Sequence, residues 1–204
     1  MSDKMVTFTI SGKVKFANVL TPKSYDSGVN KFVEDNVKGK YVAHIIVDDN
    51  SEKNKKTLDA LGIYCDQLVA EFRESERYKN NKKRFVVNPM HLTMCDDGTE
   101  LITKRNCRNK AGKEANIKLY DKYRNKLDLN SDLGRDSRVV LNFCVYSSQV
   151  EGVEKVDKKT VGVLNYYTSF CLLAVQVLDH KEPGGNVDWM DASDELVGEE
   201  EIVF

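Results

Sequence analysis

The stretch SRVVLNFCVYSS, residues 137–148, places apolar side chains at every second position from Val139 to Val145. This alternation predicts a strand that buries one of its two faces. A second β-rich run covers residues 161–178 and is long enough for two strands or for one long bent strand. These two segments indicate that the last part of the folded chain is built from β-structure.

Shorter β-rich runs lie towards the N-terminus. Residues 7–10 and 14–19 are predicted to form two strands, separated by a turn at Ser11-Gly12. After a polar loop, residues 41–47 form a continuous apolar run between turn-forming residues, which predicts a buried strand.

One helix is predicted over residues 52–77, with Asn50 or Ser51 as its N-cap. Its apolar side chains recur at spacings of three and four, at Leu58, Leu61, Cys65, Leu68, Val69 and Phe72. This spacing predicts an amphipathic helix whose apolar stripe faces a core, and it contains no cofactor-binding pattern.

Short β segments return after the helix. Residues 85–87 are the first, the hairpin signal Asp97-Gly98 leads into residues 100–105, and residues 116–120 alternate between apolar and polar side chains. Several short strands with one inserted helix predict a mainly β fold that closes fully or partly into a small barrel, because closure removes unpaired edges.

Charge divides the chain into two parts. Residues 1–180 carry 30 basic and 24 acidic side chains, a net of +6, whereas residues 181–204 carry one lysine and eight acidic side chains, a net of −7. The break at Pro183-Gly184-Gly185 ends the predicted folded domain, residues 1–180. Residues 181–204 have too little apolar content to pack alone and are predicted to be a disordered acidic tail. A basic body with an acidic tail favours a polyanionic partner, for which the tail can compete.

Several function classes find no support in the sequence. Phosphate-binding, dinucleotide-binding, serine-hydrolase and zinc-protease motifs are missing, so we expect no enzyme, no cofactor and no metal site. The five cysteines are widely spaced and the three histidines do not have zinc-ligand spacing, which indicates reduced thiols in a cytoplasmic protein. No apolar run is long enough for a membrane helix, and the N-terminus lacks a secretory signal.

The candidate binding residues are basic and aromatic side chains in two hairpin segments around residues 104–126. The basic ones are Lys104, Arg105, Arg108, Lys110, Lys113, Lys118, Lys122, Arg124 and Lys126, and Tyr120 and Tyr123 lie between them. Lysine and arginine neutralise phosphates, and exposed tyrosines stack on the bases of single strands, whereas a duplex hides its base faces. The alternative interpretation is a hydrated charged hairpin with ordinary strand tyrosines. Tyr146, Tyr166 and Tyr167 are weaker candidates, because aromatic residues in late strands are more often part of the core.

The tail combines acidic residues with apolar anchors. Its candidate partner-binding residues are Asp188, Trp189, Asp191, Asp194, Glu195, Glu199, Glu200, Glu201 and the terminal Phe204. In such a segment carboxylates can stand in for phosphates and aromatic rings for bases. It can also insert into a basic, apolar pocket of a partner protein.

In the order of these features the chain resembles the single-stranded DNA-binding proteins of T7-like and related bacteriophages. The resemblance rests on GKYVAHIIVDD at residues 39–49, on DDGTELITKRNCRNKAGKEANIKLYDKYRNKL at residues 96–127, and on the two late strand segments. Its most specific part is Gly184-Gly185 followed by Asp188-Trp189 and an acidic tail that ends in Phe204. This tail is interrupted by Leu196-Val197-Gly198 and is less densely acidic than the family leads one to expect.

The resemblance implies a five-stranded OB-fold barrel with an inserted helix that binds single-stranded DNA without sequence preference. It implies a groove that uses Lys104, Arg105, Lys118, Tyr120 and Lys122, and a tail that acts through Trp189 and Phe204. It further implies roles in DNA replication, recombination and repair, with the tail docking DNA polymerase and helicase/primase proteins and covering the groove when DNA is absent. Some members of the family form homodimers and anneal complementary strands.

Two other classes of function stay open from the sequence. One is an interaction or scaffold protein that uses its tail to dock a partner and never meets nucleic acid. The other is a metal-dependent enzyme on nucleic acid, such as a nuclease, which requires a carboxylate cluster. RNA binding is a variant of the main interpretation, because stacking and phosphate contacts do not read the sugar.

Overall fold

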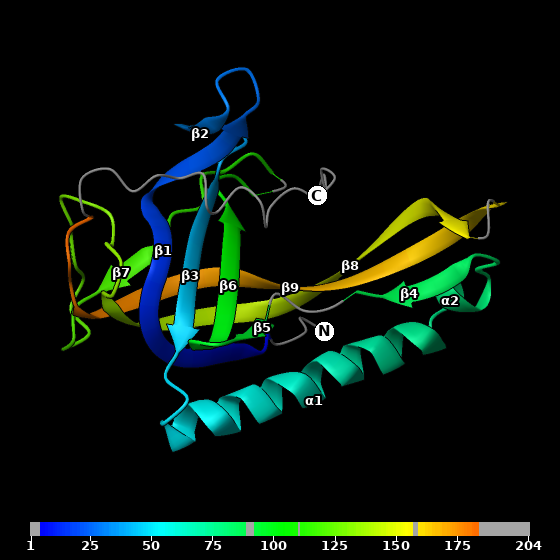
Figure 1. Ribbon diagram of the computed structural model, residues 1–204, viewed down its shortest axis with the longest axis horizontal. Coiled ribbons are helices and arrows are strands. Elements are labelled where there is room, and N and C mark those ends of the chain that lie inside the picture. The colour runs from blue at the N-terminus through cyan, green and yellow to red at the C-terminus, as the bar shows by residue number, and fades with distance from the viewer. Residues whose placement is uncertain (1–4, 89–91, 110, 157–158, 184–204) are drawn as a thin grey trace.

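The computed structural model describes residues 5–88, 92–109, 111–156 and 159–183, and these residues form a mainly β structure (Figure 1). The strands are β1 (Thr7–Asp26), β2 (Lys31–Glu34), β3 (Lys40–Val47), β4 (Arg84–Val87), β5 (Leu92–Cys95), β6 (Gly98–Asn106), β7 (Lys118–Tyr120), β8 (Arg138–Val156) and β9 (Lys159–Asp179), and the helices are α1 (Glu52–Glu74) and α2 (Glu76–Lys79). The predicted tail residues from position 184 onward lie outside the described residues.

Five of the strands pair in a closed ring. The order is β9–β8–β1–β3–β6, and Lys104 in β6 pairs with Cys171 in β9 to complete the circuit. The interior is filled by aliphatic and aromatic side chains from all five strands, among them Ile10, Ile45, Leu101, Leu141, Phe143, Phe170 and Leu172. This ring confirms the prediction of an OB-like arrangement of five strands with one long inserted helix.

The prediction of a turn at Ser11-Gly12 is wrong, because β1 runs through both residues without interruption. A Cβ atom on Gly12 would lie 2.3 Å from the carbonyl oxygen of Ile46, so glycine here permits β3 to approach β1 closely. The buried Asn54 side chain accepts a hydrogen bond from the Ser11 amide at 3.0 Å and donates one to the Ser11 carbonyl at 2.8 Å. Ser11 therefore joins β1 to α1, and Gly12 lies in the same strand where β1 approaches β3.

Residues 159–179 form one long strand, which settles the choice between two strands and one. β4, β6 and β7 all pair with β9 in parallel, at successive positions along the strand, while β8 pairs with it in antiparallel register. Beyond the ring, residues 147–156 of β8 and 159–168 of β9 continue outward together with β4. We call this part the β8–β9 extension, and Figure 1 shows it above the far end of α1.

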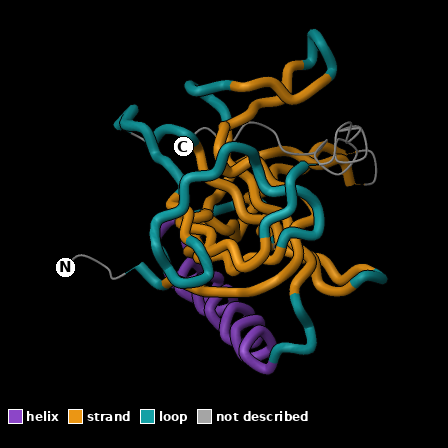
Figure 2. Tube along the Cα trace, turned by 90° about the vertical axis from the view of Figure 1, so that its left-hand side faces the viewer, coloured by secondary structure: helices purple, strands orange, loops and turns teal. Residues whose placement is uncertain are grey.

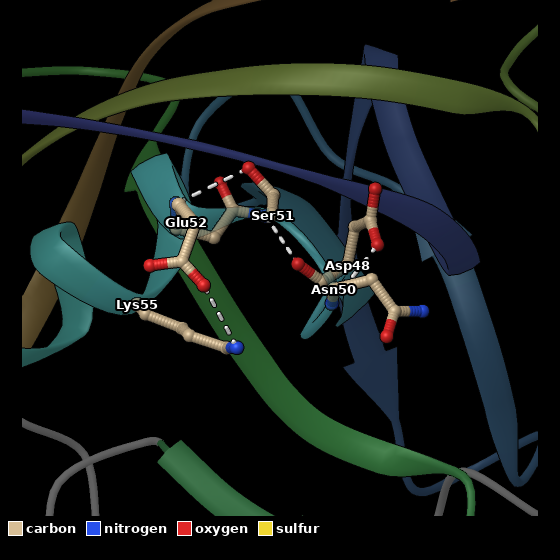
Figure 3. A network of polar contacts seen from close by, with 6 residues as sticks. Asp48, Asn50, Ser51, Glu52 and Lys55 are labelled. Atoms are coloured by element: carbon tan, nitrogen blue, oxygen red, sulfur yellow. Dashed lines mark hydrogen bonds and ion pairs between the residues drawn. The ribbon is translucent and has the colours of Figure 1, made fainter.

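The inserted helix α1 begins where the sequence predicts. The Ser51 side chain accepts a hydrogen bond from the Asn54 amide at 3.3 Å, and the Ser51 amide donates to the Asp48 carbonyl at 3.1 Å (Figure 3). An ion pair between Lys55 and Glu52 at 3.1 Å supports the first turn. The helix ends at Glu74, and Ser75 is the N-cap of α2, so the single helix predicted over residues 52–77 is interrupted near its end.

Aromatic side chains join the helices to the β8–β9 extension. The ring centroid of Phe72 lies 5.0 Å from that of Tyr166 and 5.7 Å from that of Phe85, while Tyr78 lies 5.0 Å from Phe85. This cluster is a second small core outside the ring of strands.

All five cysteines carry free thiols. Among the residues that the structure describes, no helix has the length and apolar character needed to cross a membrane.

Candidate nucleic-acid interface

A hollow of about 530 Å³ lies beside β7 at one end of the strand ring. Lys118 and Tyr120 lie on one face of β7 and the buried Leu119 on the other, as the alternation predicts. The hollow brings together three separate parts of the chain, and its lining consists of Val19, Leu20, Tyr41, Asn116, Ile117, Lys118, Leu119, Tyr120, Lys126, Leu127, Asp128 and Leu129. An apolar floor with lysines and tyrosines around it can hold a flat aromatic ligand and a nearby anion.

A tight turn after β7 carries the most exposed aromatic residue of the site. Tyr123 is 73% exposed, and the Lys122 ammonium lies 5.0 Å from the centroid of its ring. Arg124 follows with a positive φ of 69°, which closes the turn. Tyr123 therefore offers an exposed ring with the Lys122 ammonium beside it, and Arg124 is its neighbour in sequence; exposed rings with nearby cations stack bases and bind phosphates.

The carboxylate of Asp121 holds this turn in shape. It accepts hydrogen bonds from the backbone amides of Tyr123 and Asn125, both at 2.8 Å, and from the Asn125 side chain at 3.0 Å. These bonds, the Asn125 side chain first, keep the pKa of Asp121 below its ordinary value although the residue lies at the surface. Gln176 of β9 donates to the carbonyls of Asp121 and Lys122, both at 3.2 Å, so the turn is fixed to the sheet.

A second tight turn carries the predicted residues Arg108 and Lys113. The Asn109 side chain accepts hydrogen bonds from the amides of Ala111 at 3.0 Å and Lys113 at 2.9 Å, and Gly112 has a φ of 74°, which favours glycine. Both Arg108 and Lys113 are exposed, and Lys110 lies outside the described residues. The two turns correspond to the two basic hairpin segments expected from the sequence.

Lys104 and Arg105 do not share a face. They are successive residues of β6, so their side chains point to opposite sides of the sheet. Arg105 donates to the Leu172 carbonyl at 3.5 Å and lies near the buried phenol of Tyr41, whose pKa is raised chiefly by burial. Lys104 is half-buried on the other face, beside Cys171.

The structure thus brings together Lys118, Tyr120, Lys122, Tyr123 and Arg124 at the hollow and its adjoining turn. Arg108 and Lys113 form a separate group at the second turn, and Lys104 and Arg105 lie deeper in the sheet. The candidate tail residues Asp188, Trp189, Asp191, Asp194, Glu195, Glu199, Glu200, Glu201 and Phe204 are outside the described residues.

The sequence did not indicate the apolar residues that form the floor of the hollow. Val19 and Leu20 come from β1, Tyr41 from β3, and Leu127 and Leu129 from the segment after the turn. No local pattern marks them, because only the fold brings the three segments together. Tyr166, a weaker candidate, is 1% exposed and belongs to the core as expected, whereas Tyr146 and Tyr167 are half-buried. Among the described residues, no three histidine, cysteine or acidic side chains are grouped as metal ligands would be.

The chain has the fold of a phage single-stranded DNA-binding protein. Its structure matches that of gp2.5, a single-stranded DNA-binding protein encoded by bacteriophage T7, with a TM-score of 0.60 and 16% identity over 98% of each chain. The single-stranded DNA-binding protein of bacteriophage Enc34 is similar at a TM-score of 0.48, with 12% identity over 92% of this chain and 90% of that one. No protein-family model and no curated protein matches the sequence. The fold expected from the family resemblance is therefore confirmed.

Proposed function

We propose that this protein binds single-stranded DNA without sequence preference and catalyses no reaction. The observation that carries the proposal is the exposed ring of Tyr123 between Lys122 and Arg124, next to an apolar hollow bordered by Lys118 and Tyr120. Phosphates bind the cationic side chains, while bases stack on the exposed ring and enter the hollow. The fold shared with the T7 protein supports the same function.

We further propose that the protein acts in DNA replication, recombination and repair of the phage type, including strand annealing. In this proposal the acidic tail recruits DNA polymerase and helicase/primase proteins and competes with DNA for the basic surface. The net charge of −7 on residues 181–204 against +6 on residues 1–180 supports the competition. A homodimer formed through the tail is part of the same proposal.

A fluorescence-anisotropy titration tests the binding itself. The probe is a labelled dT oligonucleotide of about 30 nucleotides, long enough to fill several sites of this kind. We expect micromolar or tighter binding that weakens steeply as salt rises, because each neutralised phosphate releases counterions. A duplex of the same length serves as the control and should bind poorly. Absence of binding even after removal of the tail would favour a scaffold protein that never meets nucleic acid.

Deletion of residues 188–204 tests the role of the tail. At low salt we expect the truncated protein to bind the dT oligonucleotide more tightly than the full chain, since an internal competitor has been removed. The same deletion should weaken binding to replication proteins in a pull-down with purified components. Unchanged DNA affinity at low salt would contradict the competition and leave the binding proposal intact.

A further inference from the structure

Two cysteines face each other across β8 and β9. Cys144 of β8 and Cys171 of β9 are direct partners in the antiparallel register of the two strands. Directly opposed residues of an antiparallel pair have Cα atoms about 4.5 or 5.5 Å apart and carry their side chains on the same face of the sheet. A disulfide bond spans Cα atoms that are about 4.4–6.8 Å apart. The strand pairing therefore brings the two thiols within bonding range.

The two cysteines lie on the outer face of the strand ring. Figure 2 shows the strands curving around a common interior, with α1 outside them. The adjacent partners Phe143 and Leu172 are fully buried in that interior. Side chains alternate between the two faces along a strand, so Cys144 and Cys171 point away from the interior.

The two thiols differ in their access to solvent. β1 places Thr7 beside Cys144, and β6 places Lys104 beside Cys171. Cys144 is 7% exposed, whereas Cys171 is half-buried. A reagent in solution therefore reaches Cys171 first.

The two thiols also differ in reactivity. The hydrogen bond from the Cys144 thiol and the charge of Arg105 hold the pKa of Cys171 at about 7, against the opposing effect of burial. The same hydrogen bond, followed by burial, raises the pKa of Cys144. The thiolate is the form that attacks a disulfide, and attack is fastest when the pKa lies near the ambient pH. Cys171 is thus suited to attack, and Cys144 is suited to stay protonated until the first bond has formed.

We propose that Cys144 and Cys171 form a thiol–disulfide exchange site for acidic low-molecular-weight disulfides such as glutathione disulfide. The Cys171 thiolate attacks one sulfur of the reagent, a mixed disulfide forms on Cys171, and one glutathione thiolate leaves. The Cys144 thiol then loses its proton to solvent and attacks the Cys171 sulfur, which joins the two strands and releases the second glutathione thiolate. In total the protein loses two electrons and two protons, and glutathione disulfide is reduced to two thiols.

The charges beside Cys171 favour an acidic reagent. Lys104 is its partner in β6, and Arg105 donates a hydrogen bond of 3.5 Å to the carbonyl of the next residue, Leu172. Glutathione carries carboxylates, whereas cystamine is a cationic disulfide. We therefore expect Cys171 to react faster with glutathione disulfide than with cystamine.

The other three cysteines do not share these properties. Burial raises the pKa of Cys65 to about 11 and also raises the pKa of Cys107. Cys95 is exposed, but its register partner is Gly98 and the next two residues are Asp96 and Asp97. Cys95 is therefore expected to prefer cystamine, which makes it an internal control for the effect of charge.

Peptide mapping of the full chain tests the site. The folded, reduced protein is incubated with glutathione disulfide, the reaction is stopped with acid, and the remaining thiols are alkylated in urea before digestion with trypsin. Trypsin cuts after Lys155 and Lys159, so Cys144 and Cys171 fall on separate peptides. We expect the main product to be these two peptides joined by a disulfide, and dithiothreitol should separate them.

Three variants separate the roles of the cysteines. Cys144→Ser should stop at the first step and retain glutathione on Cys171. Cys171→Ser should react at least about tenfold more slowly at Cys144, because that thiol is buried and protonated. Cys95→Ser is the matched control and should form the joined peptides at the rate of the unaltered protein.

Two results would overturn the proposal. One is modification of Cys95 alone, with Cys144 and Cys171 both recovered as alkylated thiols. The other is joined peptides that form only when the reagent is added in urea, because the disulfide would then belong to the unfolded chain. A faster reaction of Cys171 with cystamine than with glutathione disulfide would overturn the preference for acidic reagents. These measurements use no DNA, so their failure leaves the proposed function standing.

Discussion

The Tyr166 hydroxyl donates a hydrogen bond of 2.9 Å to the Leu68 carbonyl, which joins the β8–β9 extension to the middle of α1. Tyr166 is 1% exposed, so its ring packs in the aromatic cluster and has no face for a base. Tyr166→Phe should lower the free energy of unfolding by about 1 kcal/mol through the lost hydrogen bond. Tyr166→Ala should cost about 3–5 kcal/mol, because the ring is lost as well. Urea unfolding followed by circular dichroism measures the free energy of unfolding of both variants. If Tyr166→Phe folded but bound DNA more weakly, the role of Tyr166 would not be purely structural.

The carboxylate of Glu100 should make the free energy of unfolding depend on pH. Its carboxylate lies 2.7 Å from the Lys15 ammonium and 2.8 Å from Nε2 of His44, and its side chain is only 6% exposed. Burial raises the pKa of Glu100, but the hydrogen bonds from Lys15 and His44 outweigh burial and leave the pKa below its ordinary value of 4.5. The stabilisation is therefore complete above about pH 4.5 and is lost as the pH falls through the lowered pKa.

Glu100→Gln measures this contribution. At pH 7 the variant should be less stable by about 1–3 kcal/mol, because a charged partner of a buried network is removed. The difference from the unaltered protein should shrink as the pH falls below about 4, since protonation neutralises Glu100 in the latter. Chemical unfolding at several pH values gives the free energy of unfolding of each protein as a function of pH. If the two free energies differed by the same amount at every pH, Glu100 would not titrate in this way.

Gly12→Ala should destabilise the strand ring. The added methyl group would lie 2.3 Å from the Ile46 carbonyl oxygen, a backbone atom that cannot move without separating β1 from β3. We expect a loss of about 3 kcal/mol in the free energy of unfolding. Gly62→Ala is the matched control, because a Cβ there meets no atom within 4 Å and replaces a glycine within α1. That change should stabilise the protein by about 0.5–1 kcal/mol.

Tyr123→Ser should weaken DNA binding without altering stability. The ring is 73% exposed, so its removal costs little packing but takes away a stacking surface worth about 1–3 kcal/mol per base. The affinity for single-stranded dT should fall, whereas weak binding to duplex should stay the same. Ile63→Ser, on a residue of α1 that is 61% exposed, should leave both unchanged. Equal affinities of Tyr123→Ser and the unaltered protein would remove Tyr123 from the interface.

Local patterns predicted the strands and the helix well, because alternation and helical spacing reflect burial at each position. β3, β8 and α1 lie close to where these patterns place them. The prediction of a turn at Gly12 was wrong, because glycine is typical of turns but here permits two strands to approach closely. Local patterns also missed β2, since this strand has only four residues, is charged at both ends and lies in a segment as polar as a loop.

The candidate site was predictable only in part, because local patterns do not show which distant segments meet in the fold. Lys118, Tyr120 and Tyr123 lie within six positions, and their residue types alone suggest contact with nucleic acid. The apolar floor beneath them comes from Leu20, Tyr41 and other residues distant in the sequence. Residue type indicates chemistry, whereas the shape of a hollow depends on which strands meet.

The pairings of β9 decide when the protein can fold during its synthesis. β4, β6, β7 and β8 all hydrogen-bond to β9, which leaves the ribosome after every one of them. Until residues 159–179 emerge, the ring stays open and its edges are exposed to other nascent chains. Folding is therefore expected to finish after translation has passed β9, and ribosome-bound fragments that stop earlier should be sensitive to protease and prone to aggregate.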